Sequence, residues 1–271
     1  MTNKIVDHYE KPGMGKAILN ALIMQGIDIK KLKPENLYSL DQFHTRGIVG
    51  TKDQASLTEP NETMHILDIG CGIGGSARYL AWTYGCRVTG IDITKSFIET
   101  AKLLTKKCSL DHVIDFKKGD ATDLPFDNDK FDMVWCQNVS MNIERKDLFY
   151  KEVARALKPN GRFSSSEYAL GRGGSPYYPL PWARGTQESF LISQEEMRLY
   201  TEGSGLEIID WIDKSKQILA VAPRALKILE DDDAGLQLVA GEDIATRVSN
   251  STKSMLHGHI ENIMMVAKKP L

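Results

Sequence analysis

The sequence lacks the features that mark secreted and membrane proteins. No hydrophobic run reaches the length of a transmembrane helix, and the first residues, MTNKIVDHYEKPG, contain no apolar segment typical of a secretory signal. Cysteine is scarce, and the four that occur have neither C-x-x-C spacing nor a disulfide framework pattern: Cys71, Cys86, Cys108 and Cys136. We therefore expect free thiols, a cytoplasmic or plastid location and no membrane contact.

A strong charge of either sign is also absent. The 271 residues include 34 Lys and Arg and 36 Asp and Glu, so a basic surface for nucleic acid is not indicated. His257 and His259 have no carboxylate or thiol partner at metal-ligand spacing. We expect neither a metal nor a nucleic-acid partner.

Short apolar runs and helical patterns alternate through much of the chain. Runs typical of strands occur at 64–70, 87–93, 113–121, 131–139, 162–170, 206–213 and 259–269. The first five are typical of buried parallel strands, and amphipathic helical segments separate several of them. This alternation predicts an α/β fold with a doubly wound, mostly parallel sheet.

The flanking segments predict additions to this sheet. Residues 1–60 predict an N-terminal helical cap, and residues 61–271 the main domain. Within it, the glycine- and proline-rich stretch 171–192 predicts a loop. Residues 214–258 are mostly helical in pattern and too long for a hairpin loop, so we expect a helical insert between the last two strands. We expect 171–192 and 214–258 to cover a site.

The stretch HILDIGCGIGG matches two ligand-binding fingerprints at once. The dinucleotide pattern G-x-G-x-x-G uses Gly70, Gly72 and Gly75. The pattern of S-adenosylmethionine binders, D-x-G-x-G-x-G, uses Asp68, Gly70, Gly72 and Gly74. In both, a strand ends in a glycine turn whose free N–H groups attract an anion, so the glycines alone do not decide between them.

Three acidic residues at strand ends favour the methyl donor. Asp68 would give the donor's ammonium group a counter-charge and would repel a pyrophosphate. Asp92 ends the second strand, where a carboxylate can accept both ribose hydroxyls. Asp120 follows the third strand, as if to bind an adenine amino group. Each could instead be a simple cap or turn residue. A nicotinamide dehydrogenase would need a second βαβ half and a hydride-handling His or Tyr-Lys arrangement, and the sequence shows neither.

With these motifs the chain resembles the class I S-adenosylmethionine-dependent methyltransferases. The resemblance implies a seven-stranded, mostly parallel sheet of order 3-2-1-4-5-7-6 with the final strand antiparallel. It implies S-adenosylmethionine as cofactor, with S-adenosylhomocysteine as product. It also implies donor contacts from the glycine turn and from the ends of the next strands: Asp68, Gly70, Cys71, Gly72, Gly74, Asp92, Ile93, Asp120, Ala121 and Gln137.

Three further segments are similar to the sarcosine/dimethylglycine N-methyltransferases of glycine betaine synthesis. They are LDQFHTRG, QNVSMNIERKDLFYKEV and YYPLPWARGTQESFLISQEEM. Arg46 stands where this resemblance predicts a glycine, and the strand ending Ser-Ser-Glu-Tyr departs from a more usual apolar-then-acidic pattern. The resemblance implies methyl transfer to the amine nitrogen of sarcosine or N,N-dimethylglycine, giving glycine betaine.

Such an acceptor predicts its own set of contacts. Its carboxylate favours an arginine fork, for which Arg184, Arg172 and Arg46 are candidates. Its methylated ammonium favours aromatic faces, for which Tyr168, Tyr177, Tyr178 and Trp182 are candidates. Asn138 and His44 are candidates for positioning the acceptor. In-line transfer to a nitrogen depends mainly on placement, so we assign no catalytic base.

Other interpretations stay open at this point. An O- or C-methyltransferase acting on a phenolic, lipid-like or other small molecule predicts an apolar pocket that no arginine reaches. Phosphoethanolamine is another possible acceptor. A non-catalytic donor-binding protein is the third interpretation, and the complete set of glycines and acids argues against it. The partner we expect is a small-molecule amine, and a homodimer is compatible with the sequence.

Overall fold

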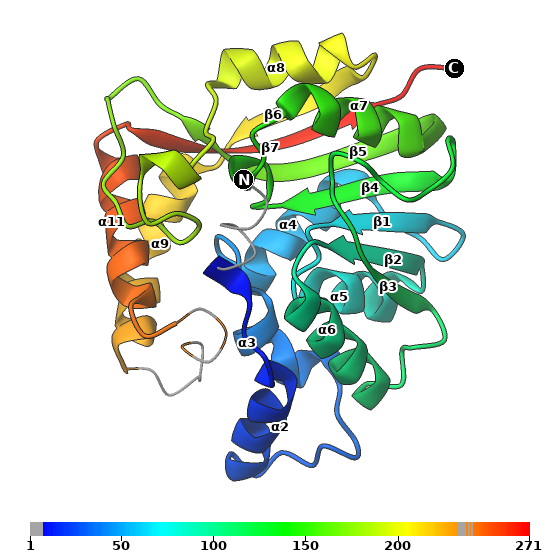
Figure 1. Ribbon diagram of the computed structural model, residues 1–271, viewed down its shortest axis with the longest axis vertical. Coiled ribbons are helices and arrows are strands. Elements are labelled where there is room, and N and C mark those ends of the chain that lie inside the picture. The colour runs from blue at the N-terminus through cyan, green and yellow to red at the C-terminus, as the bar shows by residue number, and fades with distance from the viewer. Residues whose placement is uncertain (1–7, 232–236, 238, 240) are drawn as a thin grey trace.

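Seven strands form one sheet in the computed structural model, which describes residues 8–231, 237, 239 and 241–271 (Figure 1). The strands are β1 (His65–Ile69), β2 (Arg87–Asp92), β3 (Ile114–Lys118), β4 (Phe131–Gln137), β5 (Leu157–Leu170), β6 (Glu207–Asp213) and β7 (Ile260–Lys268). Their order is β3-β2-β1-β4-β5-β7-β6, as the resemblance implied. All run parallel except β7, which is antiparallel to β5 and β6.

Helices cover both faces of this sheet, because successive strand residues bury their side chains on opposite sides. The helices α5 (Gly75–Tyr84) and α6 (Lys95–Lys107) pack on the face that carries Ile66, Val88 and Trp135. The helix α7 (Lys146–Ala156) packs on the opposite face against Leu67, Ile69, Val134 and Phe163. The helix α8 (Gln194–Gly203) contacts α7, β5 and β6. The predicted doubly wound fold is confirmed.

The N-terminal segment is helical in its described part. It contains α2 (Met14–Met24), the short 3-10 turn η1 (Pro34–Leu37), α3 (Tyr38–Asp41) and α4 (Gly47–Thr58). Ile18 and Leu22 of α2 are buried in the same apolar cluster as Leu104 of α6. The cap therefore shares the core of the main domain. Residues 1–7 of the predicted cap lie outside the described residues.

The predicted helical insert is present between β6 and β7. Its described residues include α9 (Ser215–Asp231) and α11 (Ile244–Leu256), which pack against each other beyond the ends of the parallel strands (Figure 1). Positions 232–236, 238 and 240 of this insert lie outside the described residues. The stretch 171–192 is a loop with one 3-10 turn, η3 (Thr186–Glu188). Within the described parts of the chain, no helix is both long enough and apolar enough to cross a membrane.

Candidate active site

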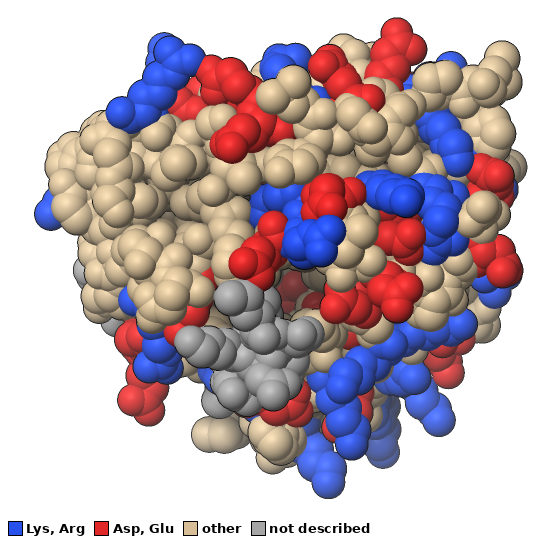
Figure 2. Space-filling view, turned by 45° about the horizontal axis from the view of Figure 1, so that its top comes forward, with Lys and Arg blue, Asp and Glu red and all other residues tan. Residues whose placement is uncertain are grey.

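A large cavity lies at the carboxyl ends of the parallel strands, where ligands bind in open α/β sheets. Its volume is about 1040 Å³, and its walls come from the glycine turn, the strand ends, the N-terminal cap, the loop 171–192 and the insert helices. Figure 2 shows an opening into the molecule that is bordered by acidic and basic side chains. One cavity of this size has room for two ligands side by side.

The glycine turn has the backbone that its sequence requires. Gly70 and Gly72 have φ of 67° and 52°, in the left-handed region that favours glycine. A Cβ on Gly70 would lie 2.3 Å from Val139 Cγ2, whereas a Cβ on Gly72 would meet no atom within 4 Å. Gly74 also has positive φ and precedes α5, and it supports the turn without lining the cavity.

Gly75 has a different reason to be glycine. A Cβ at this position would lie 2.0 Å from the carbonyl oxygen of Asp41 in the N-terminal cap. Contact between the cap and the first turn of α5 therefore requires glycine here. The dinucleotide spacing, which depends on Gly75, reflects this packing.

Asp68 has the properties expected of a ligand-binding carboxylate. It lines the cavity, is 2% exposed, and its Oδ2 atom has no hydrogen-bond partner. Burial, together with the nearby Asp92, raises the pKa of Asp68 to about 8. A buried carboxylate oxygen without a partner fits the ammonium group of a methyl donor, which would satisfy it.

Asp92 is held at the end of β2 by two backbone N–H groups. The amide of Gly72 donates to its Oδ2 at 3.0 Å, and the amide of Thr94 donates to its Oδ1 at 2.9 Å. Burial raises the pKa of this carboxyl. The neighbouring Ile93 also lines the cavity. Asp92 therefore ties the glycine turn to β2 while its carboxylate borders the cavity.

The position of Asp120 is compatible with both of its expected roles, as a turn residue and as a contact of the ligand. Its Oδ1 accepts hydrogen bonds from the amide and the hydroxyl of Thr122, at 2.8 and 2.7 Å. The residue still lines the cavity together with Ala121. The turn contact explains an acidic residue here without excluding a ligand contact.

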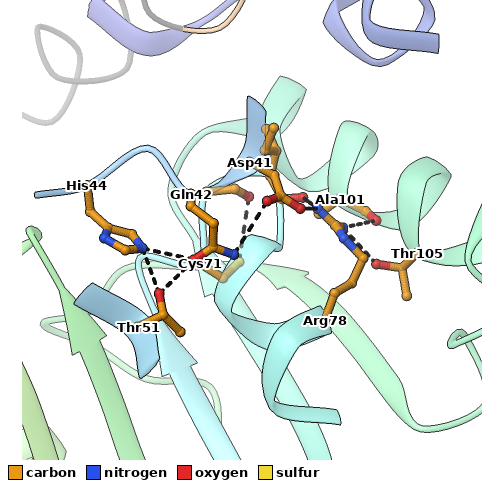
Figure 3. Close-up of polar contacts among 10 residues, drawn as sticks. Asp41, Gln42, His44, Thr51, Cys71, Arg78, Ala101 and Thr105 are labelled. Carbon is orange, nitrogen blue, oxygen red and sulfur yellow. Dashed lines mark hydrogen bonds and ion pairs between the residues drawn. The ribbon is translucent and has the colours of Figure 1, made fainter. Parts of the chain in front are cut away.

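Gln137 and His44 belong to one polar network beside the glycine turn. Gln137 Oε1 accepts from the Ser76 hydroxyl at 2.6 Å and from the indole of Trp135 at 2.9 Å. The Thr51 hydroxyl donates to Gln42 Oε1 at 2.6 Å and lies 3.0 Å from His44 Nε2 (Figure 3). Burial lowers the pKa of His44 to about 4, so this imidazole is neutral at pH 7.

The sequence did not single out the buried ion pair beside this network. The Arg78 guanidinium donates to Asp41 Oδ2 and to the carbonyl of Ile73 in the glycine turn, both at 2.8 Å (Figure 3). It also donates to the Thr105 hydroxyl at 3.0 Å. Both charged side chains are 0% exposed. The sequence signal for this ion pair was an arginine among the apolar residues of a helix. An arginine buried at such a position needs a partner of opposite charge.

Aromatic side chains line the other end of the cavity. Tyr168 stacks on Trp182 with ring centroids 4.6 Å apart, and both rings are buried. The hydroxyl of Tyr168 lies 2.8 Å from that of Thr45, and the Trp182 indole donates to Ser189 at 2.9 Å. Asn138 lines the same region with φ of 54°. Its amide nitrogen can donate to the Ser166 carbonyl at 3.2 Å while its oxygen accepts from the Thr45 amide.

Four of the expected substrate contacts do not line the cavity, and one of them is Tyr177, whose hydroxyl lies 2.9 Å from His257 Nδ1. Arg172 is 90% exposed on its side chain and pairs with Glu195, because the loop around it is hydrogen-bonded to the backbone at 258 and 259. Arg184 is exposed, since the tight turn before it directs Trp182 inward. Tyr178 packs partly buried against the cluster that contains Trp182. The placement of these four residues corrects the sequence-based expectation.

The remaining walls of this end are mostly apolar. They include one face of α9, part of α11 and two loop residues: Met141, Phe190, Ile218, Val221, Ala222, Ala225, Ile228, Val248 and Met255. Three arginines also line the cavity. Arg46 pairs with Asp53 and Arg145 with Asp147, each at 2.6 Å, whereas Arg224 of α9 is exposed. In the described residues, no group of His, Cys, Asp and Glu side chains could hold a metal ion.

Comparison with known proteins agrees with this geometry. Residues 67–165 match the family model described as a methyltransferase domain. The glycine/sarcosine/dimethylglycine N-methyltransferase of Actinopolyspora halophila is 29% identical over 189 residues, 70% of this chain and 34% of that protein. The chloroplastic tocopherol O-methyltransferase of Arabidopsis thaliana is 38% identical over 104 residues, 38% of this chain and 30% of that protein. The chain spans about a third of the length of these two curated relatives.

A solved structure shows the same fold over the whole chain. The phosphoethanolamine N-methyltransferase 2 of Haemonchus contortus, in complex with phosphomonomethylethanolamine and S-adenosylhomocysteine, superposes with a TM-score of 0.78 at 17% identity. The superposition covers 100% of this chain and 61% of that one. The likeness extends through the N-terminal cap and the insert as well as the sheet.

Proposed function

Because this chain carries a methyltransferase domain of the S-adenosylmethionine-dependent class, we propose that it methylates a small molecule whose body is mainly apolar. The donor, when bound, supplies a methyl group on a positively charged sulfur. The chain's own residues bind both partners, exclude water and align them. The observation that carries this proposal is the apolar and aromatic wall opposite the acidic donor end of one cavity.

The donor end supports specific assignments. We assign the unpartnered Asp68 carboxylate to the donor's ammonium group, and the glycine-turn N–H groups to its carboxylate. Asp92 accepts hydrogen bonds from the ribose hydroxyls and Ile93 flanks the adenine. Asp120 and Ala121 face the adenine edge. Gln137 fixes the Ser76 hydroxyl at the start of α5.

Charge and size favour an apolar acceptor over a free amino acid. A buried carboxylate needs a cation, yet two of the three cavity-lining arginines, Arg46 and Arg145, are already in ion pairs, and the third, Arg224, is exposed. A molecule as small as sarcosine would also leave most of the apolar wall in contact with water. An acceptor with a larger apolar body would cover the face that α9 presents to the cavity.

Sarcosine or N,N-dimethylglycine is the second candidate acceptor, and two observations favour it. The likeness to the Actinopolyspora halophila enzyme covers 70% of this chain, well beyond the methyltransferase domain. The stacked Tyr168 and Trp182 could hold a methylated ammonium, a contact worth about 0.5 to 2 kcal/mol. In this case Arg224, which lines the cavity and has no ion pair with any described residue, would meet the carboxylate. One methyl transfer to N,N-dimethylglycine, or two successive transfers to sarcosine, would give glycine betaine.

The two candidates are separated by methyl transfer from isotopically labelled donor. The acceptors are sarcosine, N,N-dimethylglycine, phosphoethanolamine and a tocopherol-type phenol. We expect labelled product with the phenol and little with the amino acids. Turnover of the amino acids alone would replace the first candidate by the second. If donor binds in calorimetry but no acceptor is labelled, both candidates fail.

A further inference from the structure

A short turn after β4 forms part of the acceptor end of the cavity. Val139, Met141, Asn142 and Ile143 of this turn all line the cavity, and residues 140–142 form the 3-10 turn η2 (Ser140–Asn142). Two buried charged residues of opposite sign hold it, one from β5 and one from α7. We call residues 139–143 the β4 turn.

Glu167 of β5 satisfies the donors of the β4 turn. Its carboxylate accepts from the amides of Val139 and Ser140, each at 2.9 Å, and from the Ser140 hydroxyl at 3.0 Å. The Cys136 thiol donates to it at 3.1 Å. Glu167 is 1% exposed, so these contacts replace its hydration. This explains the acid in the strand ending Ser-Ser-Glu-Tyr.

Lys146, the first residue of α7, satisfies the acceptors of the same turn. It is 3% exposed, and its ammonium group donates to the carbonyls of Ser140 at 2.6 Å and Ile143. Its third N–H group donates to the carbonyl of Phe190 in the loop 171–192, at 2.7 Å. The three protons of the ammonium group are thus all used, two on the turn and one on the loop.

The contact with Phe190 joins two segments that are distant in sequence and share one cavity wall. The amide of Phe190 in turn donates to the carbonyl of Met141 at 2.8 Å. Phe190 and Met141 both line the cavity. Burial lowers the pKa of Lys146 to about 8, with Glu167 opposing, so holding the charge here is unfavourable in itself. The three carbonyls and Glu167 offset part of that cost.

We propose that Lys146 is a positioning residue that clamps the loop 171–192 to the β4 turn and so sets the shape of the acceptor end. Its role in acceptor binding rests on the proposed function. The contact between the loop and the β4 turn can be measured without any acceptor. Lys146 does not line the cavity, and it acts through the backbones of the turn and the loop.

Hydrogen exchange by mass spectrometry tests the clamp directly. We compare the wild type with Lys146→Met and with Lys151→Met, an exposed lysine on the same helix. In Lys146→Met, amide exchange in 139–143 and 186–192 should rise by about tenfold or more, since bonds to a charged donor are lost. Exchange elsewhere and in Lys151→Met should stay at the wild-type rate. A rise spread over the whole chain, or no rise at 186–192, overturns the proposal.

Kinetics and calorimetry give the second readout. With the tocopherol-type phenol as acceptor, Lys146→Met should raise the acceptor KM while leaving the Kd of S-adenosylmethionine unchanged. Equal losses for donor and acceptor would overturn the proposal. If the wild type labels no acceptor, the proposed function fails and the exchange experiment still decides on the clamp.

A conservative variant keeps the test decisive if Lys146→Met does not fold. Lys146→Arg retains the charge but replaces a compact head of three donors by a planar fork, which matches three converging carbonyls less well. It should fold and show a smaller rise in exchange at the same two segments. Wild-type exchange at 186–192 in a folded Lys146→Arg, together with an unchanged acceptor KM, would contradict the clamp.

Discussion

At the scale of single residues, Asp68 distinguishes the two possible uses of the glycine turn. Its Oδ2 lacks a partner in a buried position, and burial with Asp92 nearby raises its pKa to about 8. A carboxyl with a raised pKa is mostly protonated at pH 7 in the free protein. An ammonium group beside it favours the ionised form, whereas a pyrophosphate would not.

This predicts proton release when the donor binds. In the free protein Asp68 holds its proton up to about pH 8, and in the complex it is ionised at pH 7. Calorimetry in two buffers of different ionisation enthalpy should show that the wild type releases up to about one proton more than Asp68→Asn at pH 7. Asp68→Asn should also bind donor roughly tenfold more weakly or worse. Equal proton release in both proteins would refute the assignment.

The same shift fixes how stability changes with pH in the free protein. Because the folded pKa of Asp68 lies above its unfolded value of 3.8, its contribution is fully present below about pH 4 and is lost as pH rises through about 8. Saturating donor should remove this loss, since the complex favours the ionised form. Urea unfolding of the wild type and of Asp68→Asn at pH 5 and pH 8, with and without donor, measures the difference.

Arg46, which stands where the resemblance predicts a glycine, has a backbone conformation typical of glycine. It has φ of 67° and ψ of 8°, the left-handed conformation that glycine adopts at little cost, which accounts for the glycine that the resemblance predicts. Its side chain is held by the ion pair with Asp53. Arg46→Ala loses the pair and keeps the strain, whereas Arg46→Gly loses the pair and relieves the strain.

The comparison of these two variants gives a clean prediction. Arg46→Gly should be more stable than Arg46→Ala by about 1 kcal/mol, the usual cost of a left-handed residue with a Cβ. Urea unfolding measures both against the wild type. If Arg46→Ala were as stable as Arg46→Gly, the left-handed backbone would carry no strain at this position.

At the scale of elements, the cap and the glycine turn are joined by the Asp41–Arg78 pair. The guanidinium also holds the Ile73 carbonyl, so α3, α5 and the turn share one buried contact. Asp41→Leu and Arg78→Met should each lower the free energy of unfolding by about 3 to 5 kcal/mol, because each leaves an unpaired buried charge.

The double variant separates the pair from simple packing. Asp41→Leu/Arg78→Met removes both charges, so its loss should be smaller than the sum of the two single losses. Urea unfolding of the four proteins completes the cycle. Additive losses would mean that the two side chains are not coupled.

The elements were largely predictable, and the side chains of the loops were not. The strands and helices follow from periodic burial, which a sequence shows directly, and the residues that we assign to the donor were singled out by their positions at strand ends. Arg172, Arg184 and Tyr178 lie on a loop whose course depends on hydrogen bonds to the backbone of residues 258 and 259. Nothing local in 171–192 encodes that contact, so the loop direction was beyond sequence reasoning.

Lys146 and Glu167 show the same limit for buried charges. An acid in a strand and a lysine at a helix start are compatible with an exposed position. Only the packed structure shows that they bind opposite sides of one turn. The sequence signal was the unusual Ser-Ser-Glu-Tyr ending of the strand. It could be interpreted only once the segments that contact Glu167 were known.

At the scale of the whole molecule, the cavity is assembled from segments far apart in the chain. The strand ends supply the acidic donor end, and the cap, the loop 171–192 and the insert supply the rest. The sheet and donor end follow the pattern shared with the class, whereas the acceptor walls are additions to it. The donor was therefore predictable, and the acceptor depends on how these additions pack.

The central claim is that one end of this cavity binds an apolar acceptor against α9. Ala222 is a buried residue of that wall, and Ala222→Trp should fill the space there. The most direct measurement is kcat/KM for a tocopherol-type phenol and for N,N-dimethylglycine in the wild type and in Ala222→Trp, with donor Kd as control. We predict that the wild type prefers the phenol, and that Ala222→Trp lowers this kcat/KM by about tenfold or more without changing donor Kd. A wild-type preference for N,N-dimethylglycine, with no effect of Ala222→Trp on the phenol, would contradict the account.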